Sequence, residues 1–371
     1  MVKTGIDDLS RADGILKGAR IGLMTNPTGV NGNMVPSIDV IREKYALTAL
    51  LACEHGVRGS VPAGEHVDTF TDEKTGVPVY SCYGKSTHLT QEMLNAFDVF
   101  VYDIQDVGAR FYTFIYSLSD AMQDCARAGK PVVVLDRPNP LGGETVQGTL
   151  LDEEVSSFVG RFAMPTRYAL TVGEYALWVK DRLKLDLDLT VVPMRGWKRS
   201  MRYSDTGLLF VPPSPNISTL HAAEVYTGTC IFEGCNVSEG RGTTLPFELI
   251  GAPFLDGDVL AKRMNALGLR GFYFRGAAFM PSCSKYSGEQ CLGVQIYVTD
   301  RERADAPKMG FLLMDEIREM AGSKFEWTGS IDRLAGTKDY REGRLDGKAL
   351  IEKHAQAVCD WQKRSSAFYL Y

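Results

Sequence analysis

The sequence has no apolar stretch near the roughly 20 residues that a membrane-spanning helix needs; its longest candidates, such as 47–53 and 132–135, have the length of strands. The first residues lack a basic region followed by an apolar one, so we expect no signal peptide in this chain. The sequence contains 41 Lys and Arg and 46 Asp and Glu, which gives a net charge of -5, and it has no dense block of basic residues. Nucleic acid is therefore not an expected partner, because it binds surfaces of dense positive charge.

Several motifs of catalysis and cofactor binding are absent too. There is no GxGxxG, no GxxxxGK[ST], no GxSxG and no HExxH, which argues against a conventional dinucleotide enzyme. The eight cysteines form no CxxC and the five histidines are scattered, so we expect neither a metal site nor a cofactor. Most cysteines are expected to be buried thiols, although Cys230 with Cys235, or Cys283 with Cys291, could bridge in an oxidising compartment.

What is present favours an α/β fold. The 371 residues are 44% hydrophobic, enough for a folded chain of about two domains. Buried strands are predicted at 19–25, 47–53, 98–104, 131–135 and 189–194, alternating with helices at 36–45, 90–97, 112–128 and 171–185. This alternation predicts a Rossmann-like, mainly parallel sheet with helices on both faces.

A proline cluster at 212–215 is the predicted domain boundary. It divides the chain into a Rossmann-like catalytic domain, residues 1–212, and a smaller α+β C-terminal domain, residues 213–371. The second domain is predicted to hold helices at 219–232, 306–320 and 346–364, strands at 271–274 and 292–298, and a Gly-rich loop at 234–243.

Polar residues follow each predicted strand of the first domain, where α/β sheets bind their ligands. Asn26 follows the first strand, and Glu54, His55 and Arg58 follow the second. Glu54 is a candidate general acid or base, because burial raises a carboxyl pKa and neighbouring charges tune it. The alternative is a Glu54–Arg58 salt bridge that only holds a loop in place.

The third strand runs into a second group of candidates. Asp103 and Asp106 could orient a sugar hydroxyl or a water molecule, and Arg110 could bind a carboxylate in a bidentate manner. Gln105, between the two aspartates, is a further candidate for substrate binding. Tyr112 could stack on a sugar ring. Helix capping by Asp106 and simple packing of the aromatic residue are the alternatives.

Two loops supply the remaining candidates. In the Asp-Arg-Pro-Asn-Pro loop, Arg137 and Asn139 could donate hydrogen bonds to ligand oxygens, or the loop could be a turn held by Asn and Pro alone. Beyond the proline cluster, Asn216, Glu239 and Arg241 lie among glycines in a pattern typical of polyol or carboxylate binding. A solvated surface loop is the alternative there.

Taken in order, these motifs resemble those of the NamZ-type exo-β-N-acetylmuramidases, from about Gly5 to the C-terminus. The matching segments are 25–29 (TNPTG), 54–59 (EHGVRG), 75–80 (TGVPVY), 103–108 (DIQDVG), 136–140 (DRPNP), 171–174 (TVGE), 213–216 (PSPN) and 238–243 (SEGRGT). Two departures are visible, because Cys53 stands where the family usually has proline and Ala169 where glycine is common.

The resemblance implies a glycoside hydrolase that removes β-1,4-linked N-acetylmuramic acid (MurNAc) from the non-reducing end of peptidoglycan fragments such as MurNAc-GlcNAc, in cell-wall turnover. It also implies an active-site cleft between the two domains, with Glu54 as the catalytic glutamate. The second catalytic group stays open among Asp103, Asp106, Glu239 and the substrate's own acetamido group. Specificity for the lactyl carboxylate is expected from an arginine, with Arg58, Arg110 and Arg241 as candidates.

Three further expectations stay open. The family's cell-wall substrate implies a periplasmic or secreted protein, with a cytoplasmic location as the alternative. A sugar-binding protein that captures muropeptide sugars without cleaving them is the alternative function. A nucleotide-dependent oxidoreductase or transferase, suggested by the sheet alone, is disfavoured by the missing phosphate-binding loop.

Overall fold

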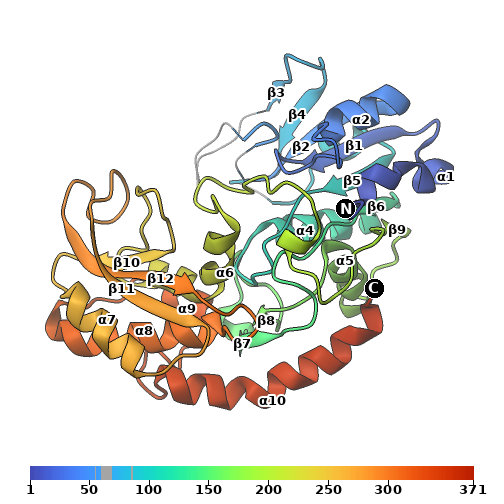
Figure 1. Ribbon diagram of the computed structural model, residues 1–371. Helices are drawn as coiled ribbons and strands as arrows, with labels where there is room; N and C mark the ends of the chain where they lie inside the picture. Colours follow the sequence, from blue (N-terminus) through green and yellow to red (C-terminus); the bar gives the residue numbers. More distant parts are fainter. Residues whose placement is uncertain (55, 60–68, 85–86) are drawn as a thin grey trace.

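The computed structural model describes residues 1–54, 56–59, 69–84 and 87–371. Its first domain is built on a seven-stranded sheet of order β3-β4-β2-β1-β5-β6-β9 (Figure 1). The strands are β1 (Arg20–Thr25), β2 (Ala46–Ala52), β3 (Phe70–Thr71), β4 (Pro78–Ser81), β5 (Val99–Asp103), β6 (Val132–Leu135) and β9 (Leu189–Val192). Neighbours pair in parallel except β3 with β4. The predicted mainly parallel sheet is confirmed.

Helices cover both faces of this sheet, because apolar side chains point alternately to either side of each strand. Leu23 and its partner Val101 belong to a core with η1, α1 and α2, whereas Met24 and Tyr102 belong to a core with α3, α4 and α5. The helices are η1 (Gly5–Ala12), α1 (Asp13–Leu16), α2 (Ser37–Lys44), α3 (Gln91–Asn95), α4 (Phe114–Arg127) and α5 (Val172–Arg182).

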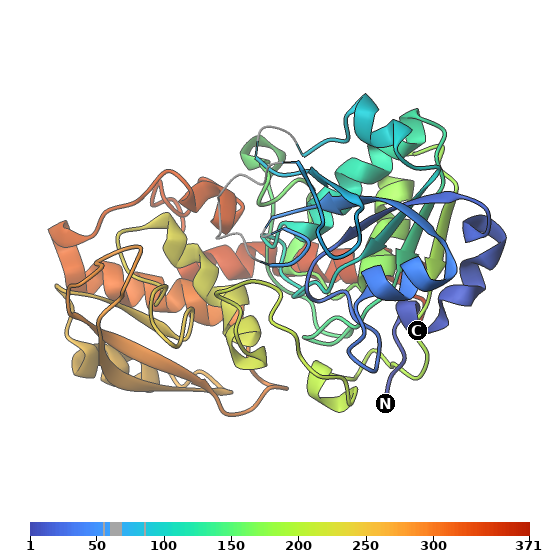
Figure 2. The same cartoon turned by 90° about the horizontal axis from the view of Figure 1, so that it is seen from above.

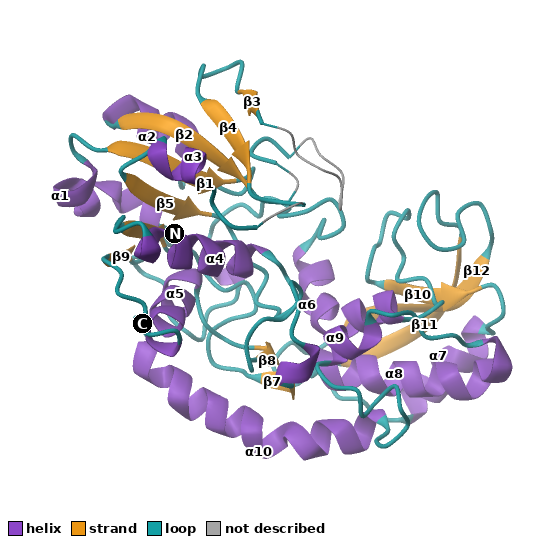
Figure 3. Cartoon of the chain, turned by 180° about the vertical axis from the view of Figure 1, so that it is seen from behind, coloured by secondary structure: helices purple, strands orange, loops and turns teal. Residues whose placement is uncertain are grey.

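The second domain begins with α6 and contains a three-stranded antiparallel sheet of order β10-β12-β11. Helices α7 and α8 lie along one side of that sheet (Figure 3). Its elements are α6 (Leu220–Thr229), η4 (Cys230–Gly234), β10 (Leu249–Ala252), α7 (Gly257–Ala266), β11 (Phe272–Phe279), β12 (Cys291–Val298), α8 (Ala306–Ala321), η5 (Gly322–Lys324) and α9 (Ile331–Ala335).

The last long helix, α10 (Gly347–Ser365), returns from the second domain to the first (Figure 2). Its Trp361 ring lies 4.9 Å from that of Trp178 on α5, and the indole N–H of Trp361 donates to the carbonyl of Tyr168 over 3.1 Å. Further short elements are β7 (Gln147–Leu150), η2 (Glu153–Val155), β8 (Pro165–Arg167), η3 (Tyr203–Asp205) and η6 (Ser366–Phe368). The two domains are therefore joined twice, once at 213–219 and once through α10.

The C-terminal residue closes this arrangement. The Tyr371 hydroxyl donates to Asp136 Oδ2 over 2.7 Å, and its ring lies 5.1 Å from that of Trp197. Val2 and Met194 belong to the same small apolar cluster. The beginning and the end of the chain thus pack together on the first domain.

Two other expectations can be compared with the structure. All eight cysteines are free thiols and six of them are buried, so neither candidate disulfide forms. None of the helices in the described ranges is both long and apolar enough to cross a bilayer.

Candidate active site

A pocket of about 170 Å³ lies between the two domains, beyond the carboxyl end of β2 and beside the start of α4. Side chains from both domains line it, and many of them are aromatic. They are Glu54, Tyr83, Phe111, Tyr112, Thr113, Phe114, Phe158, Val159, Ser214, Asn216, Ile217, Tyr226, Glu233, Arg241 and Phe247. Such a mixture of ring faces and a few charged groups suits a ligand with apolar and polar sides, such as a sugar.

Glu54 is held at one side of this pocket by two hydroxyl groups. Its Oε1 accepts a hydrogen bond from the Tyr83 hydroxyl, and its Oε2 accepts one from Thr113 Oγ1, each over 3.0 Å. Burial and the neighbouring Glu54 charge both raise the pKa of Tyr83, so this phenol stays a donor at neutral pH. The Glu54 carboxyl is therefore fixed in place yet half-exposed to the pocket.

A chain of ion pairs in the second domain includes Glu233, which is the second carboxyl group that lines the pocket. Arg241 Nη2 lies 2.5 Å from Glu233 Oε1, and Arg241 Nε lies 3.2 Å from Glu239 Oε1. Lys285 Nζ in turn lies 2.9 Å from Glu239 Oε2. Glu233 and Arg241 line the pocket, whereas Glu239 and Lys285 stand behind them. Burial raises the pKa of Glu233, and the Arg241 charge opposes that rise.

Phe247 is held in an unusual backbone conformation at the pocket wall. Its φ of 66° lies in the left-handed region, which costs a bulky residue about 1–3 kcal/mol. Its ring lies 4.7 Å from that of Tyr226, and the Arg241 guanidinium lies 5.2 Å from its centroid. The surrounding packing therefore holds this ring against Arg241, and such strain is found most often at functional sites.

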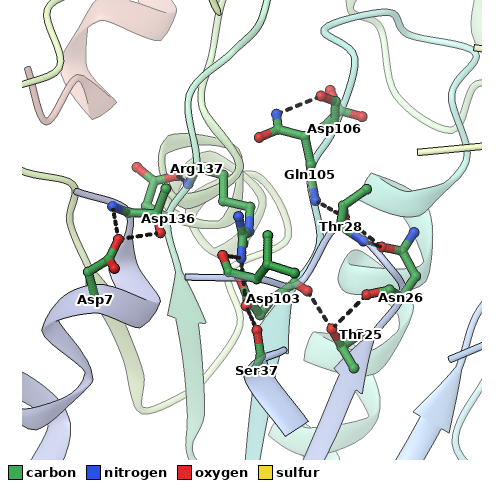
Figure 4. A network of polar contacts seen from close by, with 12 residues as sticks. Asp7, Thr25, Asn26, Thr28, Ser37, Asp103, Gln105, Asp106, Asp136 and Arg137 are labelled. Atoms are coloured by element: carbon green, nitrogen blue, oxygen red, sulfur yellow. Dashed lines mark hydrogen bonds and ion pairs between the residues drawn. The ribbon is translucent and has the colours of Figure 1, made fainter. Parts of the chain in front are cut away.

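Asp103 and Arg137 form a buried ion pair and do not line the pocket. Arg137 donates from Nε to Asp103 Oδ1 over 2.6 Å and from Nη2 to Oδ2 over 2.8 Å (Figure 4). Ser37 also donates to this carboxylate, and Arg137 also donates to the carbonyl of Val30. Both side chains are at most 4% exposed. Because the two charges neutralise each other, this ion pair connects the carboxyl ends of β5 and β6 and has a structural role.

Asn26, Gln105 and Asp106 are buried in the same network (Figure 4). Asn26 Oδ1 accepts from the amide of Thr28, and Gln105 Nε2 donates to the carbonyls of Asp106 and Pro138. Burial raises the pKa of Asp106 to about 6, while hydrogen bonds from the Tyr168 hydroxyl and the Gly108 amide oppose the rise. These three residues shape the ends of β1 and β5 behind the pocket wall.

The remaining arginine and asparagine candidates also lie outside the pocket. Arg110 is fully buried, and its guanidinium donates to the carbonyls of Thr149, Met164 and Leu334. Arg58 pairs with Asp72 over 2.9 Å, not with Glu54, and Asn139 donates to the carbonyl of Leu170. Both side chains, Arg110 and Asn139, thus donate to backbone carbonyls and hold loops in place. For Asn139 this agrees with the interpretation of its loop as a turn. His55 lies outside the described residues.

Of the candidates from sequence, the structure brings together Glu54, Tyr112, Asn216 and Arg241. Five further residues line the pocket that were not individual candidates from sequence, namely Tyr83, Thr113, Tyr226, Glu233 and Phe247. Glu233 and Phe247 do lie close to the Gly-rich loop, so that density of polar residues and glycines was the available signal. Among the described residues no cluster of His, Cys, Asp and Glu could hold a metal ion.

Comparison with known proteins gives a consistent result. Residues 21–221 match the family model described as "Exo-beta-N-acetylmuramidase NamZ, N-terminal", and residues 224–371 match its C-terminal counterpart. The chain is 46% identical to "Peptidoglycan beta-N-acetylmuramidase NamZ" of Bacillus subtilis (strain 168), an alignment that covers all of this chain and 91% of that protein. Two crystal structures of DUF1343 family proteins from Bacteroides fragilis NCTC 9343 are also similar, and each comparison covers 100% of this chain and 99% of the other chain. The first is 36% identical with a TM-score of 0.91, and the second is 29% identical with a TM-score of 0.81.

Proposed function

The chain belongs to the NamZ family of exo-β-N-acetylmuramidases, and from this membership and the pocket we propose that it releases β-1,4-linked MurNAc from the non-reducing ends of peptidoglycan fragments such as MurNAc-GlcNAc. It is an exo-acting glycosidase of peptidoglycan. The observation that carries the proposal is the position of Glu54, because it faces an aromatic-lined pocket with Glu233 and Arg241 among the other lining residues.

Glu54 is the proposed general acid. Glycoside hydrolysis commonly uses one carboxylic acid that protonates the leaving oxygen and a second group that serves the oxocarbenium-like centre. Protonation of the glycosidic oxygen by Glu54 lets the C1–O bond break. Water then adds its hydroxyl to C1 and gives its remaining proton to a carboxylate of the pocket, so that the enzyme ends each cycle in its starting protonation state. Tyr83 and Thr113 orient the Glu54 carboxyl for this transfer.

Glu233 is the proposed second carboxyl group. Asp103, Asp106 and Glu239 do not line the pocket, and each is occupied by the buried interactions described above. Glu233 lines it and is oriented by Arg241. Participation of the substrate's acetamido group is compatible with this assignment, since a carboxylate beside that group can orient it.

Replacement of Glu233 tests this role. We expect Glu233→Gln to lower kcat about 100-fold, with little change of KM, because glutamine keeps the shape but not the charge. The matched control is Glu316→Gln, which lies outside the pocket and pairs with Arg263 over the same 2.5 Å that separates Glu233 from Arg241. Equal activity of the two variants would remove Glu233 from the mechanism.

Arg241 is the proposed receptor for the lactyl carboxylate, because it is the one arginine among the described lining residues. Its ion pairs use Nε and Nη2, which leaves Nη1 for a ligand. A guanidinium binds a carboxylate through charge-assisted hydrogen bonds of fixed geometry. GlcNAc lacks the lactyl group and therefore forgoes this contact.

Replacement of Arg241 is accordingly expected to relax specificity. We predict that Arg241→Lys, which keeps the charge but not the fork, lowers kcat/KM for a chromogenic β-MurNAc about 10- to 100-fold and leaves any β-GlcNAc hydrolysis unchanged. Arg263→Lys serves as the control for an ion-paired arginine outside the pocket. A loss of the same factor on both substrates would show that Arg241 supports the fold of the pocket and not the lactyl readout.

The function itself is tested by incubating the wild-type protein with chromogenic β-MurNAc, chromogenic β-GlcNAc and MurNAc-GlcNAc. We expect cleavage of the two MurNAc compounds alone. If calorimetry showed binding of MurNAc-GlcNAc without any product, the protein would be a sugar-capturing protein instead.

Because such substrates arise at the cell wall, we also propose a periplasmic or secreted location, which fractionation of cells carrying the native gene can test.

A further inference from the structure

One face of the second domain's sheet is left open by the helices. Side chains of β11 and β12 alternate between two faces. Phe274 and its cross-strand partner Ile296 are buried in the core that includes α7 and α8. Arg275 and its partner Gln295 point to the other face, which Figures 1 and 3 show turned away from both helices.

A groove of about 860 Å³ runs over this open face and shares one lining residue, Asn216, with the active-site pocket. Arg275, Ala277 and Gln295 line its floor, and Thr243 and Thr244 line its edge. Asn216, which lines the pocket, lines the groove as well. The groove therefore begins at the pocket wall that Asn216 forms.

The chemistry of the groove suits a saccharide. Arg275 donates to Gln295 Oε1 over 2.8 Å, so both polar heads lie side by side at the surface. The next pair along the same face, beyond the residues that line the groove, is Tyr273 with Tyr297, and these two residues are 55% and 36% exposed. Exposed tyrosine rings beside amide and guanidinium donors offer a flat apolar surface and hydrogen bonds together, which is what a sugar ring requires.

We propose that this groove binds the leaving-group side of the glycan, that is, the sugars on the reducing side of the bond that is cleaved. The proposal rests on the proposed function and extends it to substrate length. An exo-acting enzyme holds one terminal sugar in its pocket, and the larger open groove then accommodates the rest of the strand. A second MurNAc residue further along the strand brings another lactyl carboxylate, for which Arg275 is the available cation.

The test compares two substrates of different length. A chromogenic β-MurNAc fills the pocket only, whereas the tetrasaccharide MurNAc-GlcNAc-MurNAc-GlcNAc also reaches the groove. We expect Arg275→Ala to lower kcat/KM for the tetrasaccharide about 10-fold and to leave the chromogenic substrate unchanged. Arg42→Ala on α2, an exposed arginine of the first domain, is the matched control.

A second variant blocks the groove sterically. Ala277→Trp places a large ring on the half-buried groove floor and is expected to reduce tetrasaccharide cleavage at least as strongly, again with unchanged chromogenic hydrolysis. Equal kcat/KM of wild type and both variants on the tetrasaccharide would overturn the proposal. Absence of cleavage of either substrate by the wild type would instead contradict the proposed function, so the two failures are distinguishable.

Discussion

Glu54→Gln is expected to lower kcat for MurNAc release by about 10²- to 10⁴-fold, the range that a positioned general acid contributes. Glutamine has nearly the shape of glutamate, but its amide cannot deliver a proton to the glycosidic oxygen. The substitution therefore removes the chemistry and preserves the volume of the pocket. The measurement is kcat and KM on chromogenic β-MurNAc, with product release from MurNAc-GlcNAc in parallel.

The fold is expected to survive this change. Glu54 is half-exposed, and its partners Tyr83 and Thr113 are hydroxyl groups, which can donate to the amide oxygen or accept from the amide nitrogen. The melting temperature of Glu54→Gln is accordingly predicted to lie near that of the wild type, and KM to change little. Full activity in a well-folded variant would exclude Glu54 as the acid.

Arg137→Met is expected to lower the stability of the fold, whereas Glu54→Gln is expected to lower activity and leave stability unchanged. Removing the guanidinium leaves the Asp103 carboxylate buried without its ion-pair partner, a change that typically costs about 3–5 kcal/mol. Urea unfolding should show this loss in the free energy of unfolding. The double variant Arg137→Met/Asp103→Leu is expected to recover part of it, because no isolated buried charge remains.

A matched surface pair supplies the control for this experiment. Arg20 and Asp98 are 2.7 Å apart, but their side chains are 50% and 46% exposed, so Arg20→Met should cost no more than about 1 kcal/mol. A stable Arg137→Met protein with a raised KM would restore the interpretation of Arg137 as a ligand for substrate oxygens.

Much of the first domain could be predicted from sequence. The five predicted strands correspond to β1, β2, β5, β6 and β9, and the four predicted helices to α2, α3, α4 and α5, with ends shifted by few residues. Strands buried on both faces read as continuous apolar runs, which are visible without any partner. Short or mixed elements such as β4 and β7 carry no such run, and the part of β11 that extends beyond the predicted strand to Phe279 alternates between the two faces of its sheet.

The site was less predictable, because residue type does not reveal the partner. Asp103 and Arg137 follow different strands and have the composition of a catalytic site, but their contact with each other is a tertiary fact. Glu233 lies on the short η4 helix, and only the packing of the second domain against the first brings it to the pocket that contains Glu54. Local sequence could identify candidate groups but not decide which of them share a cavity.

The structure shows the setting of the two residues that depart from the family pattern. Ala169 has a φ of 59°, the left-handed region where glycine is preferred, so alanine here keeps a glycine-like conformation at a cost of about 1 kcal/mol. Cys53 is fully buried beneath the Glu54 loop, and its carbonyl accepts from the amide of Gly56. Neither substitution removes a group from the pocket.

The return of α10 to the first domain determines how mechanical load passes through the molecule. Both ends of the chain are anchored in the apolar cluster of Val2, Met194, Trp197 and Tyr371. Tension applied between the two ends therefore strains the first domain at that cluster and bypasses the second domain until the cluster separates. No residue of that cluster lines the pocket, so we expect tension between the two ends to leave the pocket geometry unchanged until the cluster separates.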